Sequence, residues 1–313
     1  MKKSMFLFLA IVSLMAVIVS SCKKTPAPTA TISASIEGYT VTFAATVTDV
    51  DTYLWDFDDS NTSTEASPVH TYAMSGTYVV TLIVNGEGGE ETATKEITLA
   101  VSLTEMLTGG PAAENGKTWV LNAAYTNGDG YGPVQSLMPV LTPIADDELA
   151  LYGLEEEYDN EFTFFANGNF LMNPKNGNVL AGAVYGLVTE SIVGDPANDI
   201  GLCAATFNLP ASATWTLNET DLIVDAITDP MEEDIPPDHG NVTFSGKNWI
   251  SLSTGAYFGI LDFPSTARFI IKEITATKMS VALFICGYYY GENPDDWMLP
   301  SKMVHLTFIL KTK

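Results

Sequence analysis

Apolar and polar residues alternate with a period of two in the first part of the chain, and this feature restricts the fold more than any other. Residues 40–47 read TVTFAATV, and residues 76–84 read GTYVVTLIV. Residues 53–57 and 92–101 alternate in the same way. Short alternating runs between clusters of Gly, Asn, Asp and Ser are typical of strands. Helical periodicity is absent, so residues 32–101 are predicted to form a small all-β sandwich.

Three stretches of this region resemble the polycystic-kidney-disease (PKD) domain family. Residues 53–59 read YLWDFDD, 67–72 read SPVHTY and 75–82 read SGTYVVTL. The family has W-D-F-G-D-G, P-x-H-x-Y and G-x-Y-x-V-x-L at these places. The resemblance implies an immunoglobulin-like sandwich that acts as a spacer or interaction module. The family's turn glycines are Asp58 and Ser60 here, so a tight turn requires positive φ at residues other than glycine.

Polar side chains of this first domain raise the question of a metal site. Calcium prefers several oxygen ligands, so calcium is a candidate cofactor at the loop carboxylates. Acidic loops on a soluble domain explain the same residues, and no metal site is favoured. His70 stands alone, which favours a hydrogen-bonded structural role over metal binding. The carboxylates in question are Asp49, Asp51, Asp58 and Asp59.

The region from 103 to 313 has short strand-like runs with long connections, which predicts a larger β-sandwich or jelly-roll-like domain. Asn167-Gly168 is a hairpin signal between two such runs. The connections over residues 125–148, 173–204 and 225–241 are unusually long, and such loops often carry function. Strands are predicted over residues 117–121, 161–165, 169–172, 214–217, 221–224, 249–253, 269–274, 279–285 and 304–311.

This second region resembles the C-terminal module of PKD-containing lipoproteins from Bacteroidetes. The similar segments are residues 116–120, residues 158–164 followed by 167–170, and residues 252–259. Those lipoproteins accompany polysaccharide-utilisation systems. The resemblance therefore implies that the domain binds polysaccharide, with an outer-membrane glycan transporter complex as a further partner.

Aromatic residues in polar loops are the candidates for glycan binding, since a site of this kind joins apolar area with a few polar groups. The alternative is that these rings cap the core. Trp119, Trp215 and Trp249 lie between apolar residues and are expected in the core. The glycan-binding candidates are Trp297 with Asp295, Tyr288, Tyr289 and Tyr290 just before them, and Tyr125 and Tyr131 around an Asn-Gly-Asp-Gly turn.

Glu157, Asp159 and Glu161 provide an enzymatic alternative. On a strand, three residues spaced by two would share one face. The spacing resembles the E-x-D-x-E pattern of laminarinase-like glycoside hydrolases, and a retaining glycosidase needs two carboxyl groups about 5–5.5 Å apart. In the lipoprotein resemblance the same segment only begins a strand. No catalytic residue is therefore favoured, and the domain is expected not to be an enzyme.

The N-terminus predicts export. Lys2 and Lys3 precede an apolar run over residues 5–19, which is too short for a stable membrane span. The following V-S-S-C, ending in Cys22, resembles the lipobox of bacterial lipoproteins. It implies that residues 1–22 are a lipoprotein signal peptide with lipidation at Cys22, and that the protein is anchored in the cell envelope, at the outer membrane. Residues 23–31 are Pro-, Ala- and Thr-rich and predict an extended tether.

Charge and cysteine content limit the partners. The net charge of -24 argues against nucleic acid, whose phosphates would be repelled, and is compatible with neutral glycans. Cys203 and Cys286 either pair or remain buried thiols, and their apolar surroundings favour the thiols. The sequence thus predicts a lipid-anchored, two-domain all-β protein that binds polysaccharide. The alternatives are the glycoside hydrolase and an adhesion or envelope protein that binds a protein partner.

Overall fold

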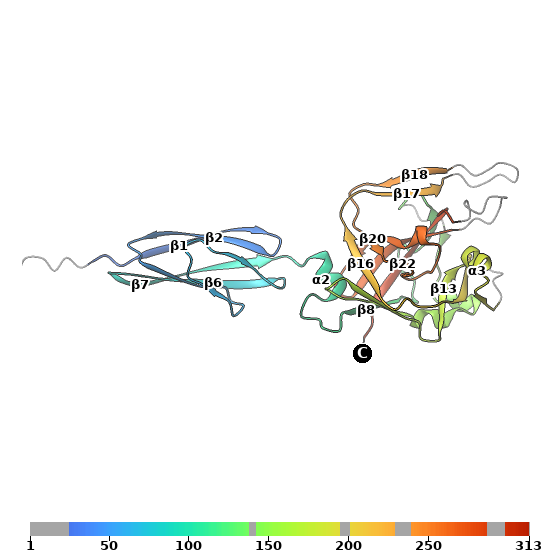
Figure 1. Ribbon diagram of the computed structural model, residues 1–313, viewed down its shortest axis with the longest axis horizontal. Helices are drawn as coiled ribbons and strands as arrows, with labels where there is room; N and C mark the ends of the chain where they lie inside the picture. The colour runs from blue at the N-terminus through green and yellow to red at the C-terminus, as the bar shows by residue number, and fades with distance from the viewer. Residues whose placement is uncertain (1–24, 138–141, 195–200, 229–238, 287–297, 313) are drawn as a thin grey trace, which may run out of the picture. The chain divides into compact units, whose positions relative to one another are not determined.

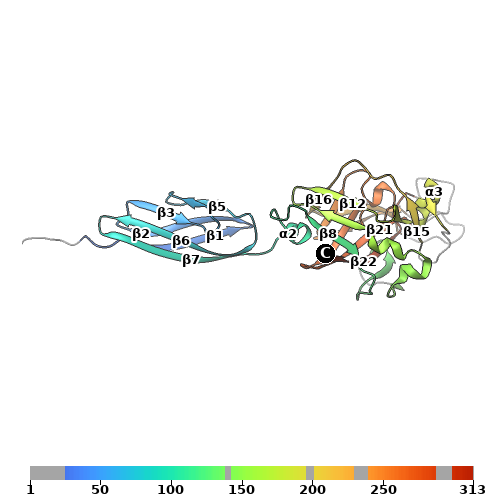
Figure 2. The ribbon, with the colours of Figure 1, turned by 90° about the horizontal axis from the view of Figure 1, so that it is seen from below.

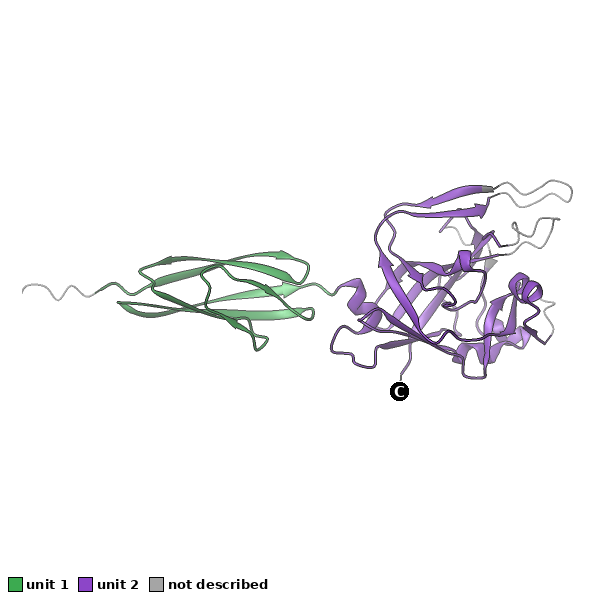
Figure 3. Cartoon of the chain, in the orientation of Figure 1, with its two compact units in different colours: residues 1–101 green, residues 102–313 purple. Residues whose placement is uncertain are grey.

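The computed structural model describes residues 25–137, 142–194, 201–228, 239–286 and 298–312 (Figure 1). It divides into two compact units, residues 1–101 and residues 102–313 (Figure 3). Across these described ranges, no helix has both the length and the hydropathy to cross a membrane.

The first unit consists of two antiparallel sheets (Figure 1; Figure 2). Each alternating run of the sequence forms a strand, and its apolar side chains face the other sheet. One sheet contains β1 (Thr29–Glu37), β2 (Thr40–Thr48) and β5 (Val69–Thr71). The other contains β4 (Thr62–Ser63), β3 (Thr52–Asp56), β6 (Gly76–Gly86) and β7 (Gly89–Leu99).

The core of the first unit is built around Trp55, which is fully buried. Its indole N–H donates to the carbonyl of Glu65 at 2.9 Å, so the polar atom of the ring is satisfied inside the sandwich. The turn after β3 has φ of 63° at Asp58 and 72° at Ser60. These are the two positions where the sequence predicted positive φ without glycine, and the prediction is confirmed.

The second unit begins with the short helix α2 (Leu103–Thr108) and continues into a sheet that closes on itself. Eight strands follow one another as an antiparallel meander, and the last pairs with the first. The all-β prediction is confirmed, and the unit is barrel-like. The eight strands are β8 (Lys117–Leu121), β11 (Glu161–Phe164), β12 (Asn169–Asn173), β16 (Ala213–Asn218), β19 (Trp249–Leu252), β20 (Arg268–Ile274), β21 (Lys278–Ile285) and β22 (Lys302–Leu310).

One edge of β22 is shared by two segments. Its C-terminal half pairs with β8, and its N-terminal half pairs with β9 (Gly130–Pro133). β9 extends the sheet further to β10 (Thr142–Pro143). The residues between β8 and β9 therefore leave the ring and return to the same edge. This excursion, residues 122–129, forms one wall of the site described below.

The inside of the closed sheet is filled by aromatic rings. Phe258, from the connection after β19, is 2% exposed, and its ring centroid lies 4.3 Å from that of Phe308 and 4.5 Å from that of Phe269. The next residue, Gly259, has φ of 70°, and a Cβ there would lie 2.7 Å from Cζ of Phe308. Glycine lets this segment enter the interior. An eight-stranded ring is just wide enough to be filled by side chains, and here it is filled.

Two additions lie outside the ring. β13 (Asn178–Gly182), α3 (Ala183–Thr189), β14 (Ile192–Val193) and β15 (Leu202–Thr206) form a small three-stranded sheet with a helix. β17 (Leu222–Ile227) and β18 (His239–Phe244) form a hairpin whose apolar side chains pack on the outer face of β20, β21 and β22. The sequence treated residues 173–204 and 225–241 as loops. This is wrong for residues 178–193 and 202–204, which belong largely to β13, α3, β14 and β15, and for residues 225–227 and 239–241, which belong to β17 and β18.

Three tryptophans of the second unit differ in how deeply they are buried. Trp119 is 0% exposed and donates to the carbonyl of Leu107, which fixes α2 against the ring. Trp215 is also buried, and its N–H donates to the carbonyl of Phe165. Both were expected in the core, and this is confirmed. Trp249 was expected in the core as well, and this is wrong: it is only half-buried, on the outer face beside the β17–β18 hairpin.

Candidate functional site

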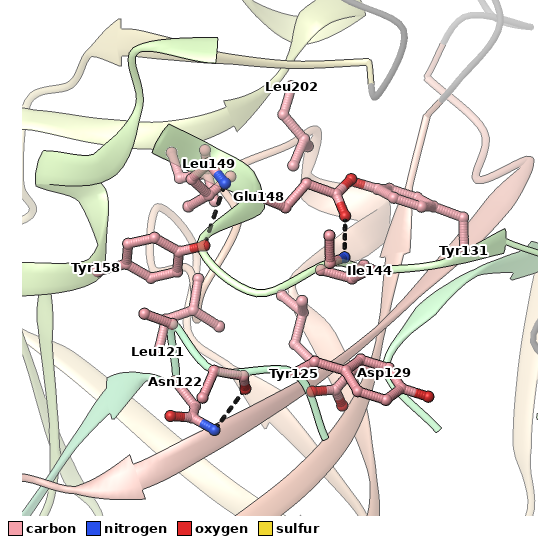
Figure 4. Close-up of a pocket in the computed structure, with 15 residues that line it drawn as sticks. Leu121, Asn122, Tyr125, Asp129, Tyr131, Ile144, Glu148, Leu149, Tyr158 and Leu202 are labelled. Atoms are coloured by element: carbon pink, nitrogen blue, oxygen red, sulfur yellow. Dashed lines mark hydrogen bonds between the residues drawn. The ribbon is translucent and has the colours of Figure 1, made fainter. Parts of the chain in front are cut away.

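A pocket lies where the end of β8, the excursion 122–129, β9 and the segment 144–149 meet (Figure 4). Its apolar base is formed by buried leucines, among them Leu121, Leu180 and Leu202. The lining residues are Leu121, Asn122, Ala123, Ala124, Tyr125, Asp129, Tyr131, Ile144, Ala145, Glu148, Leu149, Tyr158, Leu180, Leu202 and Leu306.

Three tyrosines from separate segments line this pocket (Figure 4). Tyr125 is 42% exposed, and its backbone N–H donates to Oδ1 of Asp146 at 2.6 Å. Burial, with a contribution from Glu148, raises the pKa of Tyr131 well above its usual value. The hydroxyl of Tyr158 accepts the N–H of Leu149 at 3.1 Å. The pocket is thus lined by one tyrosine that is exposed and two that are partly buried.

The polar groups of the pocket are an amide and two carboxylates. Asn122 donates from Nδ2 to the carbonyl of Ala124 at 2.7 Å, which closes a small turn (Figure 4). Asp129 is 6% exposed and accepts the hydroxyl of Thr307 at 2.8 Å; burial raises the pKa of this carboxyl group. Glu148 is partly buried and accepts the N–H of Ala145 at 2.7 Å.

A buried polar network supports the pocket from behind. Nζ of Lys272 donates to the carbonyl of Gly128 at 3.2 Å and lies 3.3 Å from Nδ1 of His305. Burial and the charge of Lys272 lower the pKa of His305 to about 4, so this imidazole is neutral at ordinary pH. The hydroxyl of Thr307 is also 3.0 Å from that of Ser280. The turn over residues 126–129 is therefore held against the outer face of β20 and β22.

The structure places two of the sequence candidates for glycan binding. Tyr125 and Tyr131 line the same pocket. The other candidates lie outside the described residues, as does the lipidation candidate Cys22: they are Trp297, Tyr288, Tyr289, Tyr290 and Asp295. Sequence reasoning missed Asn122, Glu148 and Tyr158 as partners of the two tyrosines. Nothing in the sequence placed Glu148 beside Tyr131.

The carboxylate triplet does not form the strand face that the sequence suggested. Glu157 and Asp159 belong to the 3-10 helix η2 (Glu155–Asp159), and only Glu161 begins a strand. Glu157 is buried and accepts Nδ2 of Asn160 at 2.6 Å, whereas Asp159 is exposed. The expected strand placement is therefore wrong, because the helical turn sends the side chains in different directions.

Glu161 is occupied by structural contacts. Its carboxylate forms ion pairs with Lys175, at 2.8 Å, and with Lys311, and it accepts Nδ2 of Asn173 at 3.1 Å. Two cations and an amide hold this carboxylate in place at the start of β11. The arrangement ties Lys311, near the end of the chain, to the ring and commits Glu161 to structural contacts.

In the first unit, the polar residues have structural partners. Nε2 of His70 lies 2.7 Å from Oδ2 of Asp59, and the imidazole stacks on Phe57 with a centroid distance of 4.2 Å. The predicted structural role of His70 is confirmed. Asp58 accepts the N–H of Val79 at 2.9 Å. Among the residues that the structure describes, no three His, Cys, Asp or Glu side chains form a group that could hold a metal ion, and this includes Asp49 and Asp51.

The two cysteines of the second unit are both buried and unpaired, as favoured from sequence. Burial raises the pKa of Cys203 to about 11 and raises that of Cys286 further. Neither thiol therefore carries the thiolate that nucleophilic chemistry requires at neutral pH.

Comparisons with known proteins identify the first unit. Residues 23–101 match the sequence model of the family described as PKD domain. The first unit is a PKD domain. The chain is 52% identical over 56 residues to collagenase ColQ1 of Bacillus cereus (strain Q1), which covers 17% of this chain and 6% of the collagenase. The chain therefore spans only a small part of that relative's length.

Two solved structures are also similar. The PKD1 domain of the Vibrio cholerae metalloprotease PrtV is 34% identical, with a TM-score of 0.24, over 24% of this chain and all of that domain. A structure of carbohydrate-binding modules from the β-sandwich superfamily covers 92% of this chain and 93% of its own, with 13% identity and a TM-score of 0.26. The latter likeness is too slight to indicate a ligand.

Proposed function

We propose that the second unit binds a polysaccharide non-covalently in the pocket of Figure 4, and that the PKD domain presents it as a spacer. The observation that carries this proposal is the convergence of Tyr125 and Tyr131 with Asn122, Asp129 and Glu148. Ring faces can cover the C–H faces of a sugar, while the amide and the carboxylates take its hydroxyls. A few placed polar groups on an apolar, aromatic lining are typical of small-molecule and sugar sites.

The rest of the second unit supports binding in this pocket. The interior of the closed sheet is filled by Phe258 and its neighbours, so it has no room for a sugar. The carboxylates Glu157 and Glu161 are committed to Asn160 and to two lysines. A binding role without catalysis therefore fits the described residues better than hydrolysis does.

The proposal extends to location. We propose that Cys22 is acylated, so that the protein is anchored in the cell envelope, at the outer membrane. In support, the V-S-S-C sequence follows an apolar run with two lysines before it. More than one acyl chain is needed for stable anchoring, and lipidation with N-terminal acylation would supply them.

Affinity electrophoresis tests the binding site. The protein is run in gels that contain laminarin, xylan, mannan, alginate or starch, with a reducing-sugar assay on the same mixtures. We expect retardation by at least one glycan without release of sugar. Tyr125→Ala should lose that retardation, because the exposed ring is removed while the buried base of the pocket stays intact.

The matched control is Leu151→Ala, which removes an apolar side chain that is 73% exposed on the neighbouring 3-10 helix η1 (Glu148–Tyr152) but does not line the pocket. It should be retarded like the parent. Equal retardation of Tyr125→Ala and the parent would refute the site. Absence of retardation by every glycan would instead favour a protein partner, and released sugar would favour the hydrolase alternative.

A further inference from the structure

The charge of the pocket is one-sided. Two carboxylates line it, Asp129 and Glu148, and none of the described lining residues is Lys, Arg or His. Asp146 and Asp147 directly precede Glu148 and add to the negative potential at the mouth. Fixed charge of one sign raises the local concentration of the opposite sign and repels its own. An anionic sugar such as a uronate is therefore disfavoured at this site.

The two carboxylates differ in their availability to a ligand. Asp129 is buried, accepts the hydroxyl of Thr307, and is under the influence of the charges of Lys272 and Lys278. Glu148 is only partly buried, and the one hydrogen bond it makes within the described part of the chain is from the N–H of Ala145 to Oε2. Its Oε1 is thus left for a ligand.

The position of Glu148 suits a ligand that rests on the tyrosines. Its carboxylate lies on the same side of the pocket as Tyr131, near the hydroxyl end of that ring (Figure 4). The hydrogen bond from Ala145 holds the carboxylate on that side, so less ordering is needed when a ligand binds. A cationic group on a sugar that packs against Tyr131 would meet Oε1 as a charge-assisted hydrogen bond.

We infer that the pocket binds a saccharide that carries a protonated amino group, a 2-amino-2-deoxyhexose unit, and that Glu148 accepts its ammonium group. This inference rests on the proposed function, because it names the sugar class for the same pocket. It adds a specificity residue that the aromatic pattern of the sequence does not contain.

The test compares three hexasaccharides by titration calorimetry at low salt and slightly acidic pH. They are the hexamers of glucosamine, of N-acetylglucosamine and of glucose, with oligoguluronate as the anionic probe. We expect the glucosamine hexamer to bind about fivefold more tightly than the other two, in line with one well-placed ion pair. Oligoguluronate should bind most weakly of all.

The variant Glu148→Gln separates the site from the overall charge of the chain. A net charge of -24 attracts any polycation, so the control is Glu219→Gln, which removes the same charge from an exposed residue outside the pocket. Glu148→Gln should remove the preference for the glucosamine hexamer and leave the neutral hexamers unchanged. Glu219→Gln should keep the preference.

Three outcomes would overturn the inference. The first is equal affinity of the parent for the glucosamine and neutral hexamers. The second is an equal loss of the preference for the glucosamine hexamer in Glu148→Gln and Glu219→Gln. The third is tighter binding of oligoguluronate than of the glucosamine hexamer. Binding of neutral hexamers that depends on Tyr125 would leave the proposed function standing in each case. If Glu148→Gln fails to fold, the salt dependence of binding to the parent protein decides. Added salt must lower the affinity for the glucosamine hexamer several-fold and leave the affinity for the neutral hexamers unchanged.

Discussion

Asp262 is a carboxyl group almost completely removed from water at a junction of three segments. It is 7% exposed; Oδ1 accepts the N–H of Phe263 at 2.8 Å and Oδ2 accepts the N–H of Cys286 at 2.9 Å. The third segment passes at Gly182, where a Cβ would lie 2.5 Å from Oδ2. Glycine is therefore required for the close approach, and the carboxyl group joins β13, the connection after β19 and the end of β21.

Burial raises the pKa of Asp262 to about 7, against two hydrogen bonds that lower it. Because the folded-state pKa exceeds the unfolded value of about 3.9, the protonated form is favoured by folding. Its stabilising contribution is complete below about pH 4 and is lost as pH rises through 7. The free energy of unfolding should therefore fall by about 3 kcal/mol between pH 4 and 8 from this group.

Urea unfolding of Asp262→Asn at several pH values measures this contribution. The variant cannot titrate there, so its stability should vary less with pH than that of the parent over the same window. Asp225→Asn removes an exposed carboxylate of β17 and should keep the parent's slope. An unchanged slope in Asp262→Asn would show that the carboxyl group titrates normally in the folded protein.

Single residues also show what sequence reasoning can find. Tyr125 and Tyr131 were predicted as candidates because aromatic rings in polar loops are suited to sugar binding. The structure places both in one pocket. Glu148 and Tyr158 join them from other segments. A sequence pattern predicts local geometry but not which distant segments meet. The contribution of Glu148 and Tyr158 to the pocket could therefore be found only from the folded structure.

At the scale of elements, the plug formed by Phe258 tests how the closed sheet is stabilised. The ring contacts Phe162 as well as Phe269 and Phe308. Phe258→Ala would leave a cavity that the surrounding rigid strands cannot fill. We expect a loss of about 3–5 kcal/mol in the free energy of unfolding of the second unit.

Denaturant unfolding followed by tryptophan fluorescence checks this loss. Leu187→Ala, at a residue of α3 that is 48% exposed, is the control and should change stability by less than about 0.5 kcal/mol. A loss in Phe258→Ala no greater than that of the control would mean that the interior repacks or is not filled by this ring.

The boundaries of a strand can be predicted from alternation of apolar and polar residues, but its partner strands cannot. The run predicted over residues 279–285 forms β21, Lys278–Ile285. β13 escaped prediction because its residues 179–182 are all buried, so no polar residue marks an outer face. The closure of β22 on β8 joins residues almost two hundred positions apart, and alternation alone cannot specify such a pair.

At the scale of the whole molecule, a PKD domain stands between the N-terminal segment and the unit that carries the pocket. A spacer is useful when the other end is fixed, which is the arrangement that a lipid on Cys22 would give. Each buried methylene of an acyl chain contributes about 0.8 kcal/mol, so acylation would dominate the partition of the protein between membrane and water.

Cys22→Ser is therefore expected to move the protein from the membrane fraction to the soluble fraction when the full chain is expressed in a bacterium that processes lipoproteins. The serine has no thiol to acylate, whereas the two lysines and the apolar run that would direct export are unchanged. Cys203→Ser is the matched control, because that thiol is buried in the second unit and should have no effect on partition. Metabolic labelling with a fatty acid gives a second measurement, with label on the parent and on Cys203→Ser but not on Cys22→Ser. Membrane association of an unlabelled Cys22→Ser protein would contradict the anchor and would indicate that protein contacts or an uncleaved apolar segment hold the chain at the envelope.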